Sequence, residues 1–264
     1  MSPSLRTQAL SLLLERDADR KASGVRGFAQ LDGLIDENAL LPEPPGIPGR
    51  PARPLLIAHT QLKQRSVGTL EGRARLLHAI AHIELNAIDL ALDAMWRFDG
   101  MPRAFYLDWA SVAREEALHF GLLRDHLLGL GFRYGDFPAH NALWEMAEKT
   151  KFDVLARMAL VPRTLEARGL DASPAVKAKL VSAGDVAGAA IIDVILRDEI
   201  GHVAIGNRWY RWLCAQRGLD PVAAYDELAM QHRAPRLRGP FNLEARRAAG
   251  FSEEELAKLN VDPN

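Results

Sequence analysis

The chain has 264 residues, of which 48% are hydrophobic and 25% charged, so it is long enough to bury a sizeable core and belongs to the globular class. Its formal net charge of -1 excludes nucleic-acid binding through bulk charge, although a local basic patch remains open. The single cysteine, Cys214, excludes an intrachain disulfide, and we therefore expect a protein of the reducing cytoplasm. No apolar run approaches the ~20 residues that a membrane span needs, so we expect no membrane partner.

The N-terminal part of the sequence predicts one amphipathic helix and then an irregular segment. Apolar residues at helical spacing indicate a helix over about 4–21. The stretch 23–54 is rich in glycine and proline and ends in PEPPGIPGRPARP, which excludes a continuous helix. It is either a linker or an extended arm on the surface. The arm is favoured because four apolar residues precede the proline-rich end, and their burial would decide: Phe28, Leu31, Leu34 and Ile35.

Four long segments with helical periodicity follow, over about 73–98, 105–129, 141–168 and 186–216. The breaks between them contain DGMP, LGFRYGDFP and RGLDASP, which supply the residues that stop and restart helices. In the last break, Ser173 as N-cap and Pro174 at the first position predict a short extra helix. Because no segment alternates as strands do, we predict an all-α fold: one domain over 1–264, with a four-helix bundle at about 73–216, an N-terminal arm (1–72) and a C-terminal extension (217–264).

The C-terminal extension contains five arginines between Arg233 and Arg247. They either grip an anionic partner or form a solvated strap that pairs with acids of the bundle, and the second interpretation is favoured. Further on, Ser252 and Glu255 have the spacing of a capping box, which predicts the start of a final helix.

Acidic and histidine side chains interrupt the apolar faces of the four long helices. The faces of the second and fourth helices each carry a Glu-x-x-His pair, in REEALH and RDEIGH, and residues three apart share one face of a helix. The first and third helices each carry one glutamate on an apolar stripe, where an uncompensated carboxylate would be costly. Six inward-pointing groups result: Glu84, Glu116, His119, Glu166, Glu199 and His202.

The spacing of these six residues indicates an internal repeat. Glu84 precedes Glu116 by 32 residues and Glu166 precedes Glu199 by 33, so two helical hairpins repeat the same ligands. By chance, this composition gives only about half of one Glu-x-x-His match, whereas the chain has two on apolar faces. The repeat therefore indicates one site built from two halves.

Four carboxylates and two imidazoles suit two divalent ions, because oxygen donors bridge metals and balance their charge while each histidine fixes one ion. Without metal, the glutamates would repel one another. We predict a centre with two iron ions, with manganese as the alternative. Glu115 and Asp198 precede the ligating glutamates; they either bond the histidine of the opposite hairpin, Asp198 to His119 and Glu115 to His202, or pair with neighbouring arginines.

Two other groups near these positions have structural interpretations. His78 and His82 are four residues apart, but His82 lies on the far side of its helix from Glu84, which favours hydrogen bonding over metal binding. For Arg163, pairing with surplus acids is favoured over contact with an anionic substrate.

The motifs HIELNAIDLALD, REEALH, LEARGLD and RDEIGH resemble the di-iron carboxylate site of the ferritin-like superfamily, over about 73–216. More narrowly, the chain with its GRPARP arm and RGPFNLEARRAAGF tail is similar to a bacterial ferritin-like family of unknown function. The resemblance implies a di-iron oxidoreductase that uses dioxygen to oxidise or hydroxylate a small molecule. The resemblance also makes tRNA hydroxylases possible relatives, which would imply an RNA substrate.

Three alternatives stay open beside this hypothesis: an iron-handling ferroxidase, a dimanganese enzyme, and a non-catalytic binding protein whose bundle is stabilised by metal. The long arm and tail argue against a closed storage cage, so we expect a monomer or homodimer. An electron-donor partner is a further expectation. The substrate does not follow from the sequence.

Overall fold

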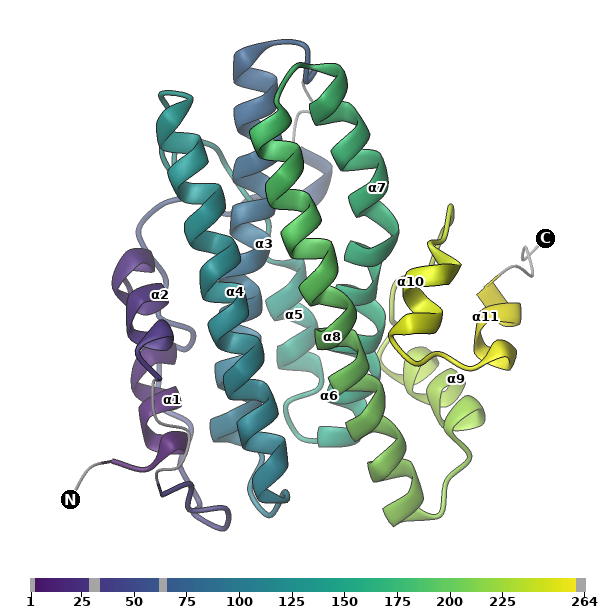
Figure 1. Ribbon diagram of the computed structural model, residues 1–264. Helices are drawn as coiled ribbons and strands as arrows, with labels where there is room; N and C mark the ends of the chain where they lie inside the picture. The colour runs from purple at the N-terminus through teal and green to yellow at the C-terminus, as the bar shows by residue number, and fades with distance from the viewer. Residues whose placement is uncertain (1–2, 29–33, 62–65, 260–264) are drawn as a thin grey trace. The chain divides into compact units, whose positions relative to one another are not determined.

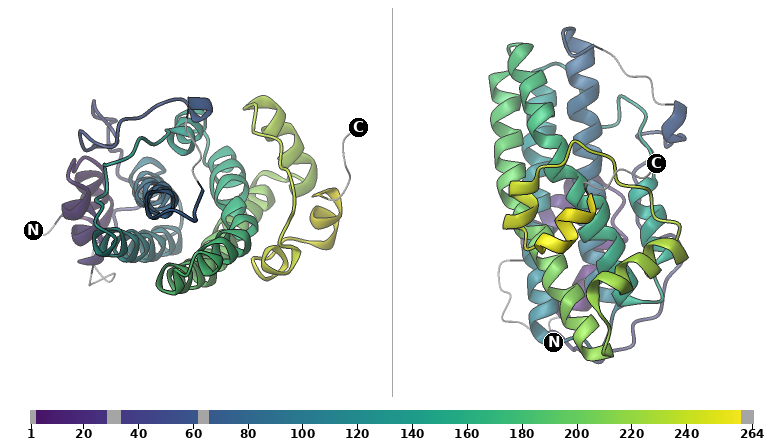
Figure 2. Two further views of the ribbon diagram at one scale, coloured as in Figure 1. Left: turned by 90° about the horizontal axis from the view of Figure 1, so that it is seen from above. Right: turned by 90° about the vertical axis from the view of Figure 1, so that its right-hand side faces the viewer.

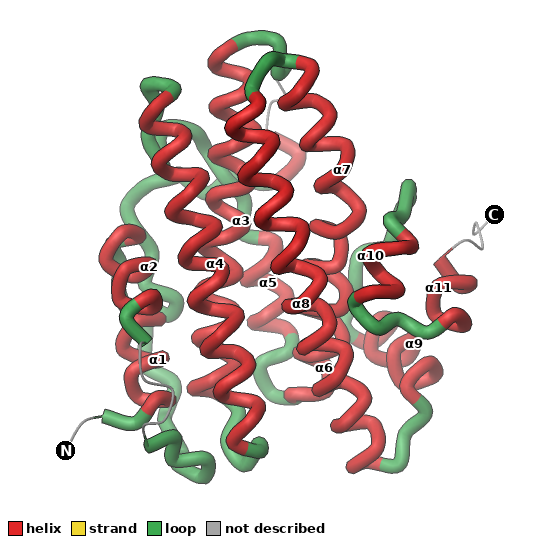
Figure 3. Tube along the Cα trace, in the orientation of Figure 1, coloured by secondary structure: helices red, strands yellow, loops and turns green. Residues whose placement is uncertain are grey.

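The computed structural model describes residues 3–28, 34–61 and 66–259, and the regular elements among them are all helical (Figure 3). The all-α prediction is therefore confirmed. No helix in these ranges is both long and apolar enough to cross a membrane. The chain divides into two compact units, which are described separately: unit 1 is Met1–Trp144 with Ser182–Ile191, and unit 2 is Glu145–Val181 with Ile192–Asn264.

Unit 1 is built on two long antiparallel helices, α3 (Leu70–Arg97) and α4 (Arg103–Gly129), which pack side by side along their length (Figures 1 and 2). The shorter α1 (Leu5–Leu13) lies against α3, and α2 (Ala18–Arg26) lies against α4. A 3₁₀ turn, η1 (His59–Gln61), precedes α3. All residues of α3 from 84 to 96 are buried, including four polar or charged ones, Glu84, Asn86, Asp89 and Asp93.

The prediction of a single helix over 4–21 is wrong, because α1 ends at Leu13 and α2 begins only at Ala18. The Glu15 carboxylate accepts a hydrogen bond from the backbone N–H of Asp17 at 2.8 Å. Asp17 in turn caps α2, since its side chain accepts from the N–H of Arg20 at 2.9 Å. A local side chain to backbone network thus competes with helix continuation at this point.

The proline-rich segment packs on unit 1 as an arm. The buried Arg6 donates to the carbonyls of Met95 and Trp96 at the end of α3, at 3.1 and 2.7 Å. The same guanidinium donates to the carbonyls of residues 36, 37 and 39 of the arm. Of the four apolar residues that precede the proline-rich end, Phe28 and Ile35 are buried, Leu34 is 68% exposed, and Leu31 lies outside the described residues. Arg6 therefore satisfies the last carbonyls of α3 and holds the arm with one side chain.

Two helices begin in unit 1 and end in unit 2: α5 (Ala142–Lys149) and α8 (Val186–Arg217). The other helices of unit 2 are α6 (Val154–Leu160), the π-helix η2 (Val161–Glu166), α7 (Ala167–Ser182), α9 (Pro221–Gln231), α10 (Leu243–Ala248) and α11 (Glu253–Leu259).

The prediction of one helix over 141–168 is wrong, because it breaks at 150–153. The Thr150 hydroxyl donates to the carbonyl of Met146, and the Asp153 carboxylate caps α6 by accepting from the N–H of Leu155. Phe152 lies in this break and is 89% exposed.

The π-helix η2 has identifiable causes. Pro162 lacks an N–H, and in a regular α-helix its ring would clash with the carbonyl four residues earlier. The Thr164 hydroxyl donates to the carbonyl five residues earlier, that of Ala159, at 2.8 Å. On α8, a Cβ added at Gly206 would lie 2.6 Å from Cβ of Pro162, so the glycine permits close approach of α8 to the π-helix.

The short extra helix predicted to begin at Pro174 is also wrong, since α7 runs through this residue. The Ser173 hydroxyl donates back to the carbonyl of Gly169 instead of capping a new helix. Pro174 leaves the carbonyl of Leu170 without its usual helical donor, and the side chain of Asn242 donates to that carbonyl at 3.2 Å. The C-terminal extension thus repairs the defect that the proline makes.

The C-terminal extension packs on α7 and α8 within unit 2. Seven buried residues form a shared apolar cluster there: Ala167, Leu170, Val203, Ala245, Ala249, Phe251 and Leu256. The predicted capping box is confirmed, because Glu255 accepts from the N–H of Ser252 and Ser252 accepts from the N–H of Glu255. Figure 2 (right) shows α9 to α11 in yellow-green and yellow, joined by irregular chain.

Candidate metal centre

Unit 1 brings together three of the predicted ligands, Glu84 of α3 with Glu116 and His119 of α4. Their side chains are buried, and each offers a ligand atom within 4.8 Å of those of the other two. Nδ1 of His119 lies 3.2 Å from Oε2 of Glu84 and 3.4 Å from Oε2 of Glu116. Two carboxylates and an imidazole facing one another in a buried position are a donor set that could hold a metal ion.

The electrostatics of this cluster follow from its composition. Burial alone would lower the pKa of His119, but hydrogen bonds to Glu116 and Glu84 and the charges of these carboxylates raise it to about 11. The imidazole is therefore protonated at neutral pH when no cation is present. A metal ion bound here would replace that proton as the positive charge between the two carboxylates, so binding releases a proton.

Unit 2 contains the second Glu-x-x-His pair, Glu199 and His202 of α8. Both side chains are buried, and Nδ1 of His202 lies 3.5 Å from Oε1 of Glu199. The i, i+3 spacing thus places glutamate and histidine on one face in both α4 and α8, as the repeated motif predicts.

Glu166, the remaining predicted ligand of unit 2, is the last residue of η2 and is half-buried. The face of α8 that carries Glu199 and His202 continues to Gly206, which touches Pro162 at the start of η2. Val203 and Ala167, which follow His202 and Glu166 in sequence, share one apolar cluster. The motif of α8 therefore faces the π-helix that ends at Glu166. Such π-helical segments are frequent at functional sites.

Glu115 and Asp198 directly precede two of the predicted ligands, Glu116 and Glu199. Asp198 accepts a hydrogen bond from Nε of its neighbour Arg197 at 2.7 Å, the alternative that the sequence left open. The bonds predicted from Asp198 to His119 and from Glu115 to His202 join the two units and stay predictions.

His78 and His82 have the hydrogen-bonded roles favoured by the sequence. Nε2 of His78 accepts from the N–H of Gly135 at 2.9 Å. Nε2 of His82 lies 3.1 Å from the carbonyl of His140, and since a carbonyl only accepts, this nitrogen donates and Nδ1 accepts from the Tyr134 hydroxyl at 2.8 Å. Burial lowers the pKa of His78 to about 4 and that of His82 to about 3, so both are neutral.

Sequence reasoning missed a buried ion pair and the setting of one buried arginine. Lys21 of α2 donates to Asp89 of α3, and burial raises the pKa of that carboxyl although Lys21 opposes the shift. The available signal was an acid, Asp89, on the apolar stripe of its helix. Arg163 of η2 pairs with Glu255 of the C-terminal helix, an acid 92 residues away that no local pattern indicates.

Comparison with known proteins identifies relatives but no activity. Residues 14–257 match the family described as protein of unknown function (DUF455). A protein of Haemophilus influenzae (strain ATCC 51907 / DSM 11121 / KW20 / Rd), described as uncharacterized, is 50% identical over 234 residues, which cover 86% of this chain and 81% of the relative. No solved structure matches the chain.

Proposed function

Since the chain belongs to the DUF455 family, whose description leaves the activity open, we propose a function from the site: oxidation of an organic substrate at a ferritin-like centre of two metal ions. The two hairpins would supply one shared set of ligands, Glu84, Glu116, His119, Glu166, Glu199 and His202. Iron is the proposed metal and manganese the alternative, because both accept carboxylate and imidazole donors.

The observation that supports this proposal best is the buried trio of unit 1, two glutamates and a histidine with ligand atoms within 4.8 Å. Apolar surroundings make such a group costly unless a cation balances the carboxylates. Unit 2 repeats the Glu-x-x-His pair on a buried helix face beside a π-helix that ends at a further glutamate. The repeat in sequence, 32 and 33 residues between corresponding glutamates, favours one shared centre over two unrelated sites.

Iron held by these ligands would supply the dioxygen chemistry that protein side chains lack. The chain's own groups would hold the ions, with Glu116 and Glu199 each beside the histidine of its motif. His119 would lose its proton on binding, and the buried helix faces would keep bulk water from the ions. Hydroxylation or oxidation of a small organic molecule, with electrons from a separate donor, is the reaction class proposed.

Metal content per chain tests the centre. The full-length protein is loaded anaerobically with ferrous or manganous ion and measured by elemental analysis, beside Glu116→Gln and Glu199→Gln. The matched control is Glu227→Gln, an exposed glutamate of α9. We expect about two ions per chain in the parent and the control. Because a shared centre needs both halves, each ligand variant should lose most of both ions.

Two results would contradict the proposal at different levels. Loss of one ion in Glu116→Gln and of the other in Glu199→Gln would indicate two independent sites and not one shared centre. Absence of metal from the parent would remove the metal function altogether. If the loaded protein with a reductant consumes dioxygen no faster than free iron does, the oxidation chemistry is wrong even where the centre exists.

A further inference from the structure

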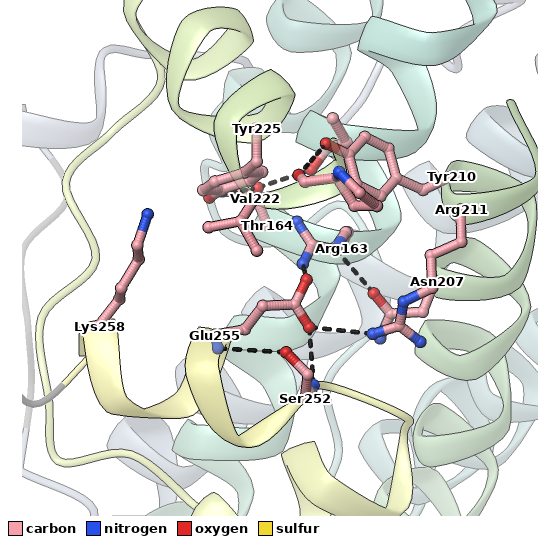
Figure 4. Close-up of polar contacts among 12 residues, drawn as sticks. Arg163, Thr164, Asn207, Tyr210, Arg211, Val222, Tyr225, Ser252, Glu255 and Lys258 are labelled. Atoms are coloured by element: carbon pink, nitrogen blue, oxygen red, sulfur yellow. Dashed lines mark hydrogen bonds and ion pairs between the residues drawn. The ribbon is translucent and has the colours of Figure 1, made fainter. Parts of the chain in front are cut away.

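Unit 2 contains a cavity of about 980 Å³ that the proposed metal function does not use. Its walls come from α9, from the irregular segment 234–239 that follows it, and from α11, and the buried Arg163 of η2 also lines it. This volume is at the upper end of the range typical of small-molecule sites. Figure 4 shows part of the wall, with Arg163 between Tyr225, Tyr210 and Glu255.

The charges that line the cavity are predominantly positive. Five are cationic, Arg163, Arg236, Arg238, Arg246 and Lys258, and two are acidic, Asp226 and Glu255. Both acids are already paired: Glu255 accepts from Arg163, and Asp226 accepts from Lys258 at 2.7 Å. Arg236 and Arg238 are exposed and make no ion pair with a described residue. The cavity thus has an excess of guanidinium groups over carboxylates.

Arg246 provides an independent observation that points to a ligand. This side chain is fully buried, and Asp171 accepts from its Nε and Nη2 at 2.9 and 2.6 Å. Its Nη1 is buried too but has no hydrogen-bond partner among the described residues. A buried donor without an acceptor is destabilising, and an anionic oxygen is the acceptor that a guanidinium binds best.

The cavity also has an apolar side. Phe241 and Phe251 line it, and Arg246 stacks over both rings with its Cζ 5.4 and 5.3 Å from the ring centroids. Met230 lines it as well and is 78% exposed. An inorganic anion would leave this apolar surface in water, whereas a ligand with a hydrophobic body would cover it.

We propose that this cavity binds a small organic anion, a carboxylate or phosphate monoester joined to an apolar body. Arg236 and Arg238 of the segment 234–239 and the unpartnered Nη1 of Arg246 bind the anionic group, and Phe241 and Phe251 contact the apolar body. Of the five arginines between Arg233 and Arg247, Arg246 pairs with Asp171 of α7 and Arg247 pairs with Glu253, whereas Arg236 and Arg238 are left for an anionic ligand. The inference is independent of the metal centre.

Isothermal titration calorimetry on the full-length, metal-free protein tests this inference. The probes are phenyl phosphate, phenylacetate and inorganic phosphate, which together separate the anionic group from the apolar body. The variants are Arg236→Gln and Arg238→Gln; both residues are exposed, so the fold should persist. The matched control is Arg233→Gln, which removes an exposed arginine that directly precedes this segment and does not line the cavity.

We expect saturable binding of phenyl phosphate or phenylacetate, tighter than that of inorganic phosphate. Each cavity variant should weaken binding about tenfold and the control hardly at all, because a charge-assisted contact is lost only in the former. Equal loss in all three variants would indicate diffuse charge attraction and overturn the proposal. So would the absence of saturable binding, or binding of a mixed-sequence RNA oligomer where neither organic anion binds. Glu116→Gln should bind phenyl phosphate like the parent, so failure of the metal centre and failure of the cavity are distinguishable.

Discussion

Acidification should destabilise the protein through its buried neutral histidines, His78 and His82, and the share of His78 can be measured on its own. Nε2 of His78 accepts from the N–H of Gly135, the ring of His78 stacks on Tyr134 with centroids 5.2 Å apart, and burial lowers the pKa of His78 to about 4. The ordinary pKa of histidine is about 6.5. Below that pH, His78 is therefore protonated in the unfolded chain but stays neutral in the folded chain until the pH approaches 4. The stabilising effect is complete above pH 6.5 and is lost as the pH falls toward 4.

The size of the effect follows from the two pKa values. Proton linkage gives a loss in the free energy of unfolding of about 2 kcal/mol between pH 8 and pH 5, rising to about 3 kcal/mol at pH 4. The assay is urea unfolding across this pH range for the parent and for His78→Gln, whose amide oxygen still accepts from Gly135 but does not titrate. The difference between parent and variant should change by about 2 kcal/mol from pH 8 to pH 5. A constant difference would refute this assignment of the proton, and His232→Gln, at a half-buried position on the end of α9, is the matched control.

Two further substitutions test the packing beside the site. Lys21→Met should lower the free energy of unfolding by about 3–5 kcal/mol, because it leaves the charge of Asp89 buried and unpaired. The double variant Lys21→Met, Asp89→Leu should regain most of the lost stability. A double variant as unstable as Lys21→Met alone would contradict this explanation. Gly206→Ala should cost about 1–3 kcal/mol, because the new Cβ would lie 2.6 Å from Cβ of Pro162. Denaturant unfolding measures both, and Gly206→Ala with parental stability would mean that α8 does not need this close approach.

The sequence predicts the long helices and the motifs on them because both depend on local spacing. Apolar periodicity locates α3, α4 and α8 to within a few residues, and the i, i+3 spacing places Glu116 and His119 on one buried face. The errors lie where side chains compete with the backbone, as at Asp17 and Asp153, or where a distant residue repairs a helix. Pro174 has the local sequence of a helix start, but it lies inside α7, where the carbonyl that it leaves without a donor accepts from Asn242, 68 positions further along the chain.

The buried cations were beyond prediction for a related reason. Arg6 binds carbonyls 89 and 90 residues away, and Lys21 binds a carboxylate 68 residues away. From the neighbouring sequence alone, Arg6 and Lys21 are ordinary polar positions of short amphipathic helices. Their burial depends on which carbonyl or carboxylate the fold brings to them, and helical periodicity carries no information on that.

The surroundings of Arg163 show why the C-terminal extension belongs to the scaffold of the candidate site. Arg163 lies three residues before Glu166 in the same π-helix, and its Nε donates to Asn207 of α8 at 2.8 Å while Nη2 donates to Glu255 of α11 (Figure 4). Asn207 in turn donates to the carbonyl of Ala249 at 2.8 Å. A π-helix is an irregular conformation that persists only where its surroundings fix it. Because groups of the extension bind Arg163 directly and through Asn207, the extension helps to fix the turn that presents Glu166. The long tail beyond α8 is therefore part of what positions Glu166, the predicted ligand of this turn.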